Sequence, residues 1–224
     1  MSWSELGEWW VDEISTDPAY EEVVTPMLIE SLQPVAGRLY LDLGSGDGRV
    51  MRAVAAAGAS VHGLDVNPDL AGRSSQWGPT MVGRLPELGF VAGRPYDGAY
   101  CVLVIEHLED HRSLFHSVAA VVAPGGVFAL VMNHPIWTAP SSSPFSDTDG
   151  EVLWRPGEYF SSGTTEEPAG ENRVTFHHRT MSSLLNAAAD EGWALERMAE
   201  TPHHQLEEQR GIPRLLTCRW RLLP

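Results

Sequence analysis

The sequence predicts an α/β protein built around a mostly parallel sheet with helices on both faces. Apolar runs of strand length alternate with helix-forming stretches through residues 38 to 134, and parallel strands require a crossover of this kind between neighbours. The length of 224 residues suits one full-sized domain with a buried core and is slightly short for two. We therefore expect a single domain.

The composition narrows the range of partners. The chain has 30 acidic and 15 basic residues, a formal net charge of −15, and no lysine. A surface of this charge repels phosphate backbones, so we expect no nucleic-acid partner. A small molecule is the expected partner, and the protein is expected to be a monomer or a homodimer.

The cysteines and the N-terminal segment bear on the compartment. Cys101 and Cys218 lie in apolar runs without a metal-ligand or redox spacing, so we interpret them as buried apolar residues. The first 15 residues contain acids and tryptophans where a signal peptide has a basic region and an apolar core. No apolar run reaches membrane-spanning length. These features favour a soluble cytoplasmic protein that does not contact a membrane.

Cap and turn residues set the boundaries that we expect in the first part of the chain. Helices are expected at residues 4–15, 19–32, 47–58 and 109–126, with another that begins at a cap formed by Asn67. Strands are expected at residues 37–44, 59–66, 79–83, 96–108 and 127–135.

The alternation of strands and helices stops after Pro135. Residues 141–172 are rich in Ser, Gly, Pro and acids and predict a long irregular insertion. Its embedded aromatic residues favour a folded lid over a linker. A strand, a helix from Thr180, a strand from Trp193 and a last strand at 213–223 are expected to complete the chain.

A glycine-rich loop follows the first expected strand. It has the form Asp42-x-Gly44-x-Gly46-x-Gly48, and such a loop allows close approach of the backbone to a ligand. A dinucleotide fingerprint would need a glycine where Arg49 stands. The Asp42 carboxylate would repel a pyrophosphate and suits an ammonium group, while loop N–H groups can bind a carboxylate or ribose oxygens.

A second acidic residue ends the next strand. Asp65 in "HGLDVNP" lies at about the expected distance beyond the glycines for a carboxylate that binds both ribose hydroxyls. Either feature alone is weak. In this order on neighbouring strands, they predict a nucleoside cofactor at the carboxyl edge of the sheet.

At these motifs the sequence resembles the class I methyltransferases that use S-adenosylmethionine. "LDLGSGDGR" is similar to their first motif, "GLDVNP" to their second-strand acid, "YDGAYCVLVIEHLED" to their fourth strand and "APGGVFAL" to the turn into the fifth. The resemblance implies a three-layer Rossmann-like sandwich. Its mostly parallel seven-stranded sheet would carry an antiparallel C-terminal strand, N-terminal helices and a lid insertion.

The resemblance also implies a division of the single domain. A helical N-terminal cap would occupy residues 1–35, the cofactor-binding core 36–134, a substrate-side insertion 135–179, and a helix with strands 180–224.

The resemblance implies that S-adenosylmethionine is the cofactor and S-adenosylhomocysteine the product. The implied cofactor-binding residues are Tyr20, Asp42, Gly44, Ser45, Gly46, Gly48, Arg49, Asp65, Val66, Arg84, Leu85, Ile105 and Glu106. One position departs from the family pattern. Arg84 stands where members often carry an acid that binds the adenine amino group, so adenine recognition is expected to rest on the backbone near Arg84 and Leu85.

Histidines and aromatic residues are the candidates for the acceptor side. His107 after the fourth strand and His134 after the fifth are the candidate general bases, while His177 is interpreted as structural. Candidate substrate-binding residues are Trp10, Trp137, Trp154, Tyr159 and His178. We expect no metal, because the acids near the fourth strand do not form a ligand set.

The predicted function is methylation of a small, apolar or aromatic acceptor at oxygen or nitrogen, by in-line displacement, in secondary metabolism. Two alternatives stay open. A non-catalytic cofactor-binding or regulatory protein would share every loop feature. A nicotinamide-dependent oxidoreductase would share the fold class, but Arg49 disfavours it.

Overall fold

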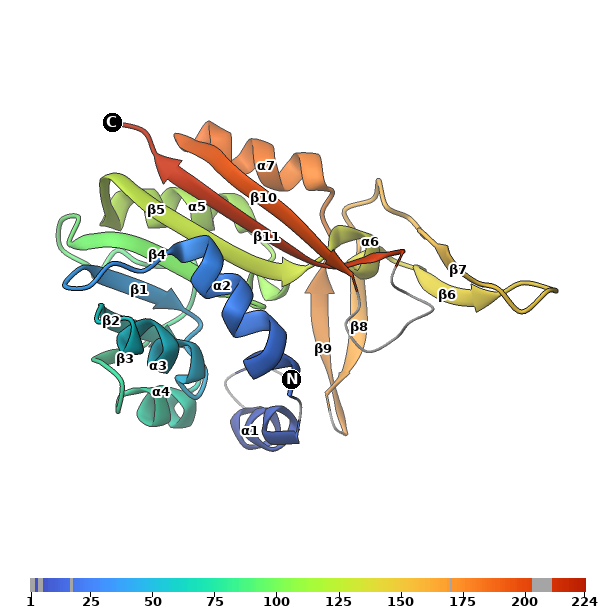
Figure 1. The fold of residues 1–224 in the computed structure, drawn as a ribbon, viewed down its shortest axis with the longest axis horizontal. Coiled ribbons are helices and arrows are strands. Elements are labelled where there is room, and N and C mark those ends of the chain that lie inside the picture. Colours follow the sequence, from blue (N-terminus) through green and yellow to red (C-terminus); the bar gives the residue numbers. More distant parts are fainter. Residues whose placement is uncertain (1–2, 4–5, 17, 170, 203–210) are drawn as a thin grey trace.

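The computed structural model describes residues 3, 6–16, 18–169, 171–202 and 211–224. A seven-stranded sheet of order β10-β11-β5-β4-β1-β2-β3 forms its centre (Figure 1). Its strands are β1 (Leu39–Leu43), β2 (Ser60–Asp65), β3 (Thr80–Val82), β4 (Tyr96–Val102), β5 (Val122–Asn133), β10 (Trp193–Pro202) and β11 (Pro213–Leu222). β11 runs antiparallel to both of its neighbours, and the other pairings are parallel. The predicted fold class is therefore confirmed.

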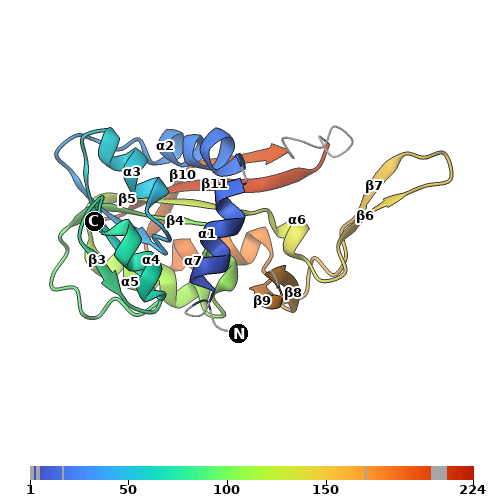
Figure 2. The same cartoon turned by 90° about the horizontal axis from the view of Figure 1, so that it is seen from below.

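Helices cover both faces of this sheet (Figures 1 and 2). The helical segments are α1 (Gly7–Thr16), a π-turn η2 (Tyr20–Val24), α2 (Thr25–Leu32), α3 (Arg49–Ala56), α4 (Pro68–Ser74), a 3-10 turn η3 (Ile105–His107), α5 (His111–Val121), α6 (Pro135–Thr138) and α7 (Met181–Asp190). α2 and α3 pack in one apolar cluster and α5 and α7 in another. The cap predicted at Asn67 is present, since its side chain accepts from the N–H groups of Asp69 and Leu70. No helix in the described ranges is long and apolar enough to cross a membrane.

Aromatic side chains fill the core under α5 and α7. Phe115, Phe128 and Trp220 pack with ring centroids 5.4–5.8 Å apart, and the Trp193 indole N–H donates to the Phe115 carbonyl at 3.1 Å. These contacts attach the C-terminal strands to the parallel part of the sheet. Both cysteines are buried thiols, as predicted.

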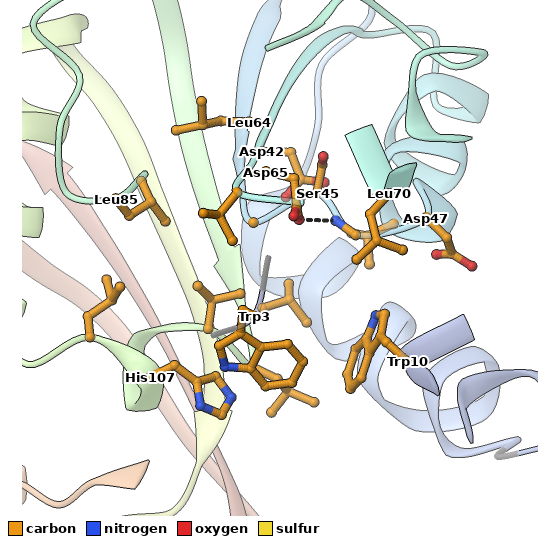
Figure 3. Close-up of a pocket in the computed structure, with 18 of the residues that line it drawn as sticks. Trp3, Trp10, Asp42, Ser45, Asp47, Leu64, Asp65, Leu70, Leu85 and His107 are labelled. Carbon is orange, nitrogen blue, oxygen red and sulfur yellow. Dashed lines mark hydrogen bonds between the residues drawn. The ribbon is translucent and has the colours of Figure 1, made fainter. Parts of the chain in front are cut away.

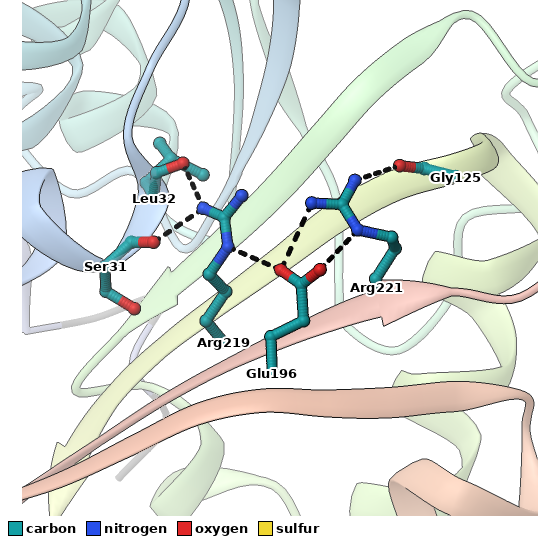
Figure 4. Close-up of polar contacts among 6 residues, drawn as sticks. All are labelled: Ser31, Leu32, Gly125, Glu196, Arg219 and Arg221. Carbon is teal, nitrogen blue, oxygen red and sulfur yellow. Dashed lines mark hydrogen bonds and ion pairs between the residues drawn. The ribbon is translucent and has the colours of Figure 1, made fainter.

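Two arginines of β11 connect that strand to α2 and to the neighbouring strands β10 and β5 (Figure 4). Arg219 donates to the Ser31 and Leu32 carbonyls at 2.7 and 2.6 Å, which satisfies carbonyls at the end of α2. The Glu196 carboxylate on β10 pairs with both Arg219 and Arg221. Hydrogen bonds from Arg221 and Arg219 hold the pKa of Glu196 below its usual range, although partial burial opposes this.

Several predicted boundaries were wrong. α5 ends at Val121 and β5 begins at Val122, because residues before Gly126 already pair with β4 through an irregular register. β4 ends at Val102, because Leu103 adopts a left-handed conformation with φ of 54° and breaks the strand. The expected helix at 19–32 begins with the π-turn instead of a regular α-helical turn.

The insertion was predicted to be irregular but contains two hairpins. One pairs β6 (Ser143–Ser146) with β7 (Val152–Arg155), and the other pairs β8 (Thr164–Ala169) with β9 (Asn172–His177). The β6–β7 hairpin extends away from the body of the protein, whereas β8–β9 lies beside it (Figure 2). Polar residues on the exposed strands obscure the alternation that would have indicated them.

Gly48 brings the glycine loop against α4. It has a φ of +88°, and a Cβ at this position would lie 2.7 Å from the Ser74 Cα. We predict that Gly48→Ala destabilises the protein by about 1–3 kcal/mol, from left-handed strain and overpacking. Gly72→Ala is the matched control, because Gly72 has open space around its Cα and lies inside α4. That variant should be more stable by about 0.5–1 kcal/mol. Urea unfolding followed by circular dichroism measures both, and equal stability of the two variants would contradict the packing described.

Candidate active site

A cavity of about 330 Å³ opens at the carboxyl ends of the central strands (Figure 3). It lies between β1 and its two neighbours β4 and β2, where the strand order reverses direction along the chain. Ligands of open α/β sheets bind at such a switch point. Residues of the glycine loop, the end of β2, the segment after β4, the N-terminal segment and β9 line the cavity.

The glycine loop has a shape that non-glycine residues disfavour. Gly44 and Gly46 have φ of +85° and +53°, and a Cβ on Gly44 would lie 2.5 Å from the Val104 side chain. The N–H groups of Gly44 and Ser45 donate to the Leu64 carbonyl at 2.8 and 2.9 Å. These hydrogen bonds attach the loop to β2, and the missing Cβ of Gly44 lets the loop pack closely against the segment after β4.

Asp42 is a buried acid at the bottom of the cavity. Asp42 is only 2% exposed, and its Oδ2 atom has no hydrogen-bond partner among the described residues. Burial raises the pKa of Asp42 well above its usual range, the Tyr100 hydroxyl opposes this shift, and the Asp65 charge adds to it. A buried carboxylate oxygen without a donor suits a positively charged or N–H-bearing ligand group.

Asp65 lies beside Asp42 in the cavity (Figure 3) and its carboxylate is held by the backbone. Its Oδ2 accepts from the Gly46 N–H at 2.8 Å and its Oδ1 from the Asn67 N–H at 2.8 Å. Burial raises the pKa of Asp65, while these N–H groups act in the opposite direction. Each carboxylate oxygen has a further lone pair, so the group can also accept hydrogen bonds from a ligand.

An ion pair borders the cavity near the start of α3. Arg49 binds Asp47 through its Nη2 and Nε atoms at 2.8 and 3.1 Å, and its guanidinium lies 5.4 Å from the centre of the Tyr20 ring. Burial raises the pKa of Asp47, but the hydrogen bonds and charge of Arg49 outweigh it and hold that pKa below its usual range. Arg49 therefore stays in place as a positive group at the cavity wall.

His107 lies at the other end of the cavity (Figure 3). Its Nδ1 is 3.2 Å from the Thr175 carbonyl oxygen, which can only accept, so Nδ1 carries the proton in the neutral ring. The Trp3 and Phe176 rings pack against it with centroids 4.6 and 4.7 Å away. Burial lowers the pKa of His107, which favours neutral imidazole at neutral pH.

The structure brings together most of the residues predicted from the sequence. The predicted residues that line the cavity are Trp10, Tyr20, Asp42, Gly44, Ser45, Gly46, Arg49, Asp65, Val66, Arg84, Leu85 and His107. Gly48, Ile105 and Glu106 lie outside its lining. Gly48 packs on α4, Ile105 is part of the core, and the buried Glu106 carboxylate accepts from the Asn133 N–H and side-chain amide.

His134, the second candidate base, is not among the predicted residues that line the cavity. Its Nδ1 accepts from the Ile136 N–H at 3.1 Å, and its Nε2 lies 2.8 Å from Glu200. Both ring nitrogens are thus used within the fold, where the ring caps α6.

Four predicted substrate residues also lie outside the cavity lining. Trp137 and Trp154 pack on each other with centroids 4.1 Å apart. His178 bonds to the Thr138 hydroxyl and the Tyr159 carbonyl, and the Tyr159 hydroxyl accepts from the Met181 N–H. These residues join the insertion to the sheet.

Other lining residues were missed from the sequence. Trp3 was not singled out among the N-terminal tryptophans, although it lies against His107. Thr175 of β9 also lines the cavity and was not singled out, whereas His177, two residues further along the strand, was considered and interpreted as structural although it lines the cavity too. No cluster of three or more potential metal ligands occurs in the described ranges.

Comparison with known proteins agrees with this geometry. Residues 41–130 match the family model described as a methyltransferase domain. The ubiquinone biosynthesis O-methyltransferase of Bordetella avium is 33% identical over 139 residues, covering 56% of this chain and 56% of that protein. A corresponding enzyme of Thiobacillus denitrificans is 29% identical over 143 residues and covers 58% and 60%. The matches thus span just over half the length of these curated relatives.

Solved structures extend the comparison to nearly the whole chain. An S-adenosylmethionine-dependent methyltransferase from Mesorhizobium loti is 27% identical, with a TM-score of 0.79 over 93% of this chain and 99% of that one. The 1,6-didemethyltoxoflavin-N1-methyltransferase of Burkholderia thailandensis, 14% identical with a TM-score of 0.61 over 96% and 83%, shares the fold. The chain is therefore similar to S-adenosylmethionine-dependent methyltransferases in residues 41–130 and in its fold, which agrees with the resemblance that its motifs indicated.

Burial of Asp42 predicts a pH-dependent effect of its replacement. The pKa of Asp42 is higher in the folded protein than in the unfolded chain, where it is about 3.9. The ligand-free protein therefore loses stability as the pH rises from the unfolded pKa through the folded pKa. Asn has no proton to lose. We therefore predict that Asp42→Asn raises the melting temperature of the ligand-free protein, by more at pH 8 than at pH 5. Thermal denaturation at both pH values measures this. An increase in melting temperature that is the same at both pH values would show that ionisation of Asp42 does not destabilise the folded protein.

Proposed function

We propose that this protein transfers a methyl group from S-adenosylmethionine to a hydroxyl group of a small aromatic acceptor. The observation that carries the proposal is the placement of His107 in the same cavity as Asp42, Asp65 and the glycine loop. The curated relatives are named O-methyltransferases, which favours oxygen over nitrogen as the methylated atom.

The cavity residues fit the cofactor at both of its polar ends. Asp42 offers a carboxylate oxygen to which no described residue donates, which matches the cofactor ammonium. Asp65, fixed by two N–H groups, can accept from ribose hydroxyls. Arg49 supplies a positive charge for the carboxylate, and the backbone near Leu85 lies in the cavity for the adenine.

S-adenosylmethionine supplies an electrophilic methyl group on its sulfonium. His107 acts on the acceptor: with the proton on Nδ1, its Nε2 has no hydrogen-bond partner among the described residues and can take the acceptor proton. The acceptor oxygen then forms its bond to the methyl carbon as the carbon–sulfur bond breaks. The products would be the methyl ether of the acceptor, S-adenosylhomocysteine and a protonated His107, which would release its proton to water.

Aromatic and apolar side chains around His107 favour a flat, apolar acceptor. Trp3 and Trp10 pack edge to face with centroids 5.5 Å apart. With Val104 and Leu108, they surround the histidine end of the cavity. Aromatic walls bind a planar ring and exclude water from the reacting atoms.

Asp65→Ala should weaken binding of S-adenosylhomocysteine by about tenfold to a hundredfold, because two hydrogen bonds to a charged acceptor are lost. The wild type is expected to bind with a dissociation constant in the micromolar range. Asp69→Asn is the matched control, since Asp69 is exposed at the start of α4 and lies outside the cavity lining. Isothermal titration calorimetry measures all three proteins. Absence of binding to the wild type would exclude the proposed cofactor.

His107→Gln should lower the rate of methyl transfer by about 10²–10⁴-fold with little change in S-adenosylhomocysteine affinity. Transfer of radiolabelled methyl to a panel of phenols, catechols and amines measures the rate, and phenolic acceptors are expected to react. Because burial lowers the pKa of His107 from its ordinary value, the wild-type rate should rise with pH only in the acidic range and should already be independent of pH near neutrality. His116→Gln, an exposed histidine paired with Glu191, is the control. Cofactor binding without transfer to any acceptor would instead support a non-catalytic protein.

A further inference from the structure

A buried arginine lies behind the segment that carries His107. Arg179 lies between β9 and α7 and is only 5% exposed. Its Nη1 donates to the Ile105 carbonyl at 2.8 Å and its Nη2 to the Leu108 carbonyl at 2.6 Å. These two carbonyls lie on either side of His107 in the chain. The guanidinium therefore binds both ends of the turn that presents the imidazole.

The turn needs such support because its backbone is strained and short. Leu103, just before it, has a φ of 54°, a conformation that costs a non-glycine residue free energy. η3 contains only three residues, and two backbone hydrogen bonds, from the His107 N–H to the Val104 carbonyl and from the Leu108 N–H to the Ile105 carbonyl, close it at 2.9 and 3.1 Å. Val104, His107 and Leu108 all line the cavity, and a shift of this turn would move the imidazole.

Burial of the guanidinium is costly, which argues against a purely space-filling role. Burial lowers the pKa of Arg179 to about 10, so the side chain is still charged at neutral pH. Its two hydrogen bonds go to backbone carbonyls instead of a carboxylate. A buried charge of this kind contributes less to stability than an apolar side chain of the same volume.

We propose that Arg179 is a positioning residue that fixes the orientation and tautomer of His107, an inference that rests on the role of His107 proposed above. Arg179 holds the turn from behind, while the Thr175 carbonyl of the same chain segment orients Nδ1. The adjacent His178 is bound to Thr138 and to the Tyr159 carbonyl. Residues 175–179 thereby join the insertion, the core and the base in one rigid unit.

The charge of Arg179 also acts on His107. Four groups shift the pKa of the buried imidazole: Glu106 beside it in η3 and the Thr175 carbonyl raise it, and His177 on β9 and Arg179 lower it. Without the guanidinium, less positive charge offsets the effect of the Glu106 carboxylate on His107. The pKa of His107 should therefore rise in a variant that lacks this charge.

Nuclear magnetic resonance of protein labelled with ¹⁵N and ¹³C in histidine tests this without an acceptor. The signals of His107 are assigned by their loss in His107→Gln. In the wild type we expect the neutral ring to carry its proton on Nδ1. In Arg179→Met we expect a mixture of both neutral tautomers and a higher pKa, with S-adenosylhomocysteine affinity changed less than about threefold. The rate with a phenolic acceptor should fall by about tenfold to a hundredfold.

Two further variants make the outcome decisive. Arg179→Lys keeps the charge but loses the paired hydrogen bonds, so it should loosen the tautomer while the pKa of His107 stays near the wild-type value. It also replaces the Met variant should that variant not fold. Arg112→Met, at an exposed arginine paired with Asp190, should change neither signal. A wild-type tautomer in either folded Arg179 variant would overturn the proposal, and this result is independent of whether the protein methylates any acceptor.

Discussion

The hydrogen bond from the Gly46 N–H to the Asp65 carboxylate is the contact on which the site depends. It joins the loop after β1 to the end of β2 at 2.8 Å, in parallel with the bonds from Gly44 and Ser45 to the Leu64 carbonyl. The loop is thus held in place before any ligand arrives, with Gly44 packed closely against the Val104 side chain. A site that is formed in advance loses less conformational entropy when it binds.

The same arrangement places two carboxyl groups in a buried position that disfavours their negative charge. Asp42 and Asp65 lie on neighbouring parallel strands, and burial raises the pKa of both. Asp42 in addition keeps an oxygen that accepts no hydrogen bond from the part of the chain that the structure describes. Unfavourable burial of this kind is common at functional sites, because the ligand supplies the missing partners.

The core of the fold, and the grouping of the glycine loop with Asp42 and Asp65 in one cavity, could be predicted from the sequence because local rules determine them. Strand length and the Asn67 cap follow from local sequence, and the glycine loop and the acids at strand ends converge at one edge of a parallel sheet. The acceptor side could not be predicted in this way. His134 and His107 both follow a strand, and only tertiary contacts with Glu200 and Thr175 distinguish a capping histidine from one that faces the cavity. Trp137 and Trp154 similarly pack on each other, whereas Trp3 reaches His107 from the far end of the chain.

A crystal structure with S-adenosylhomocysteine tests the central claim most directly, because it shows where each polar end of the ligand lies. The account predicts the amino group at the Asp42 Oδ2, the ribose hydroxyls on the Asp65 carboxylate and the sulfur facing the His107 end of the cavity. A ligand bound with its ribose away from Asp65, or with its sulfur directed away from His107, would contradict it.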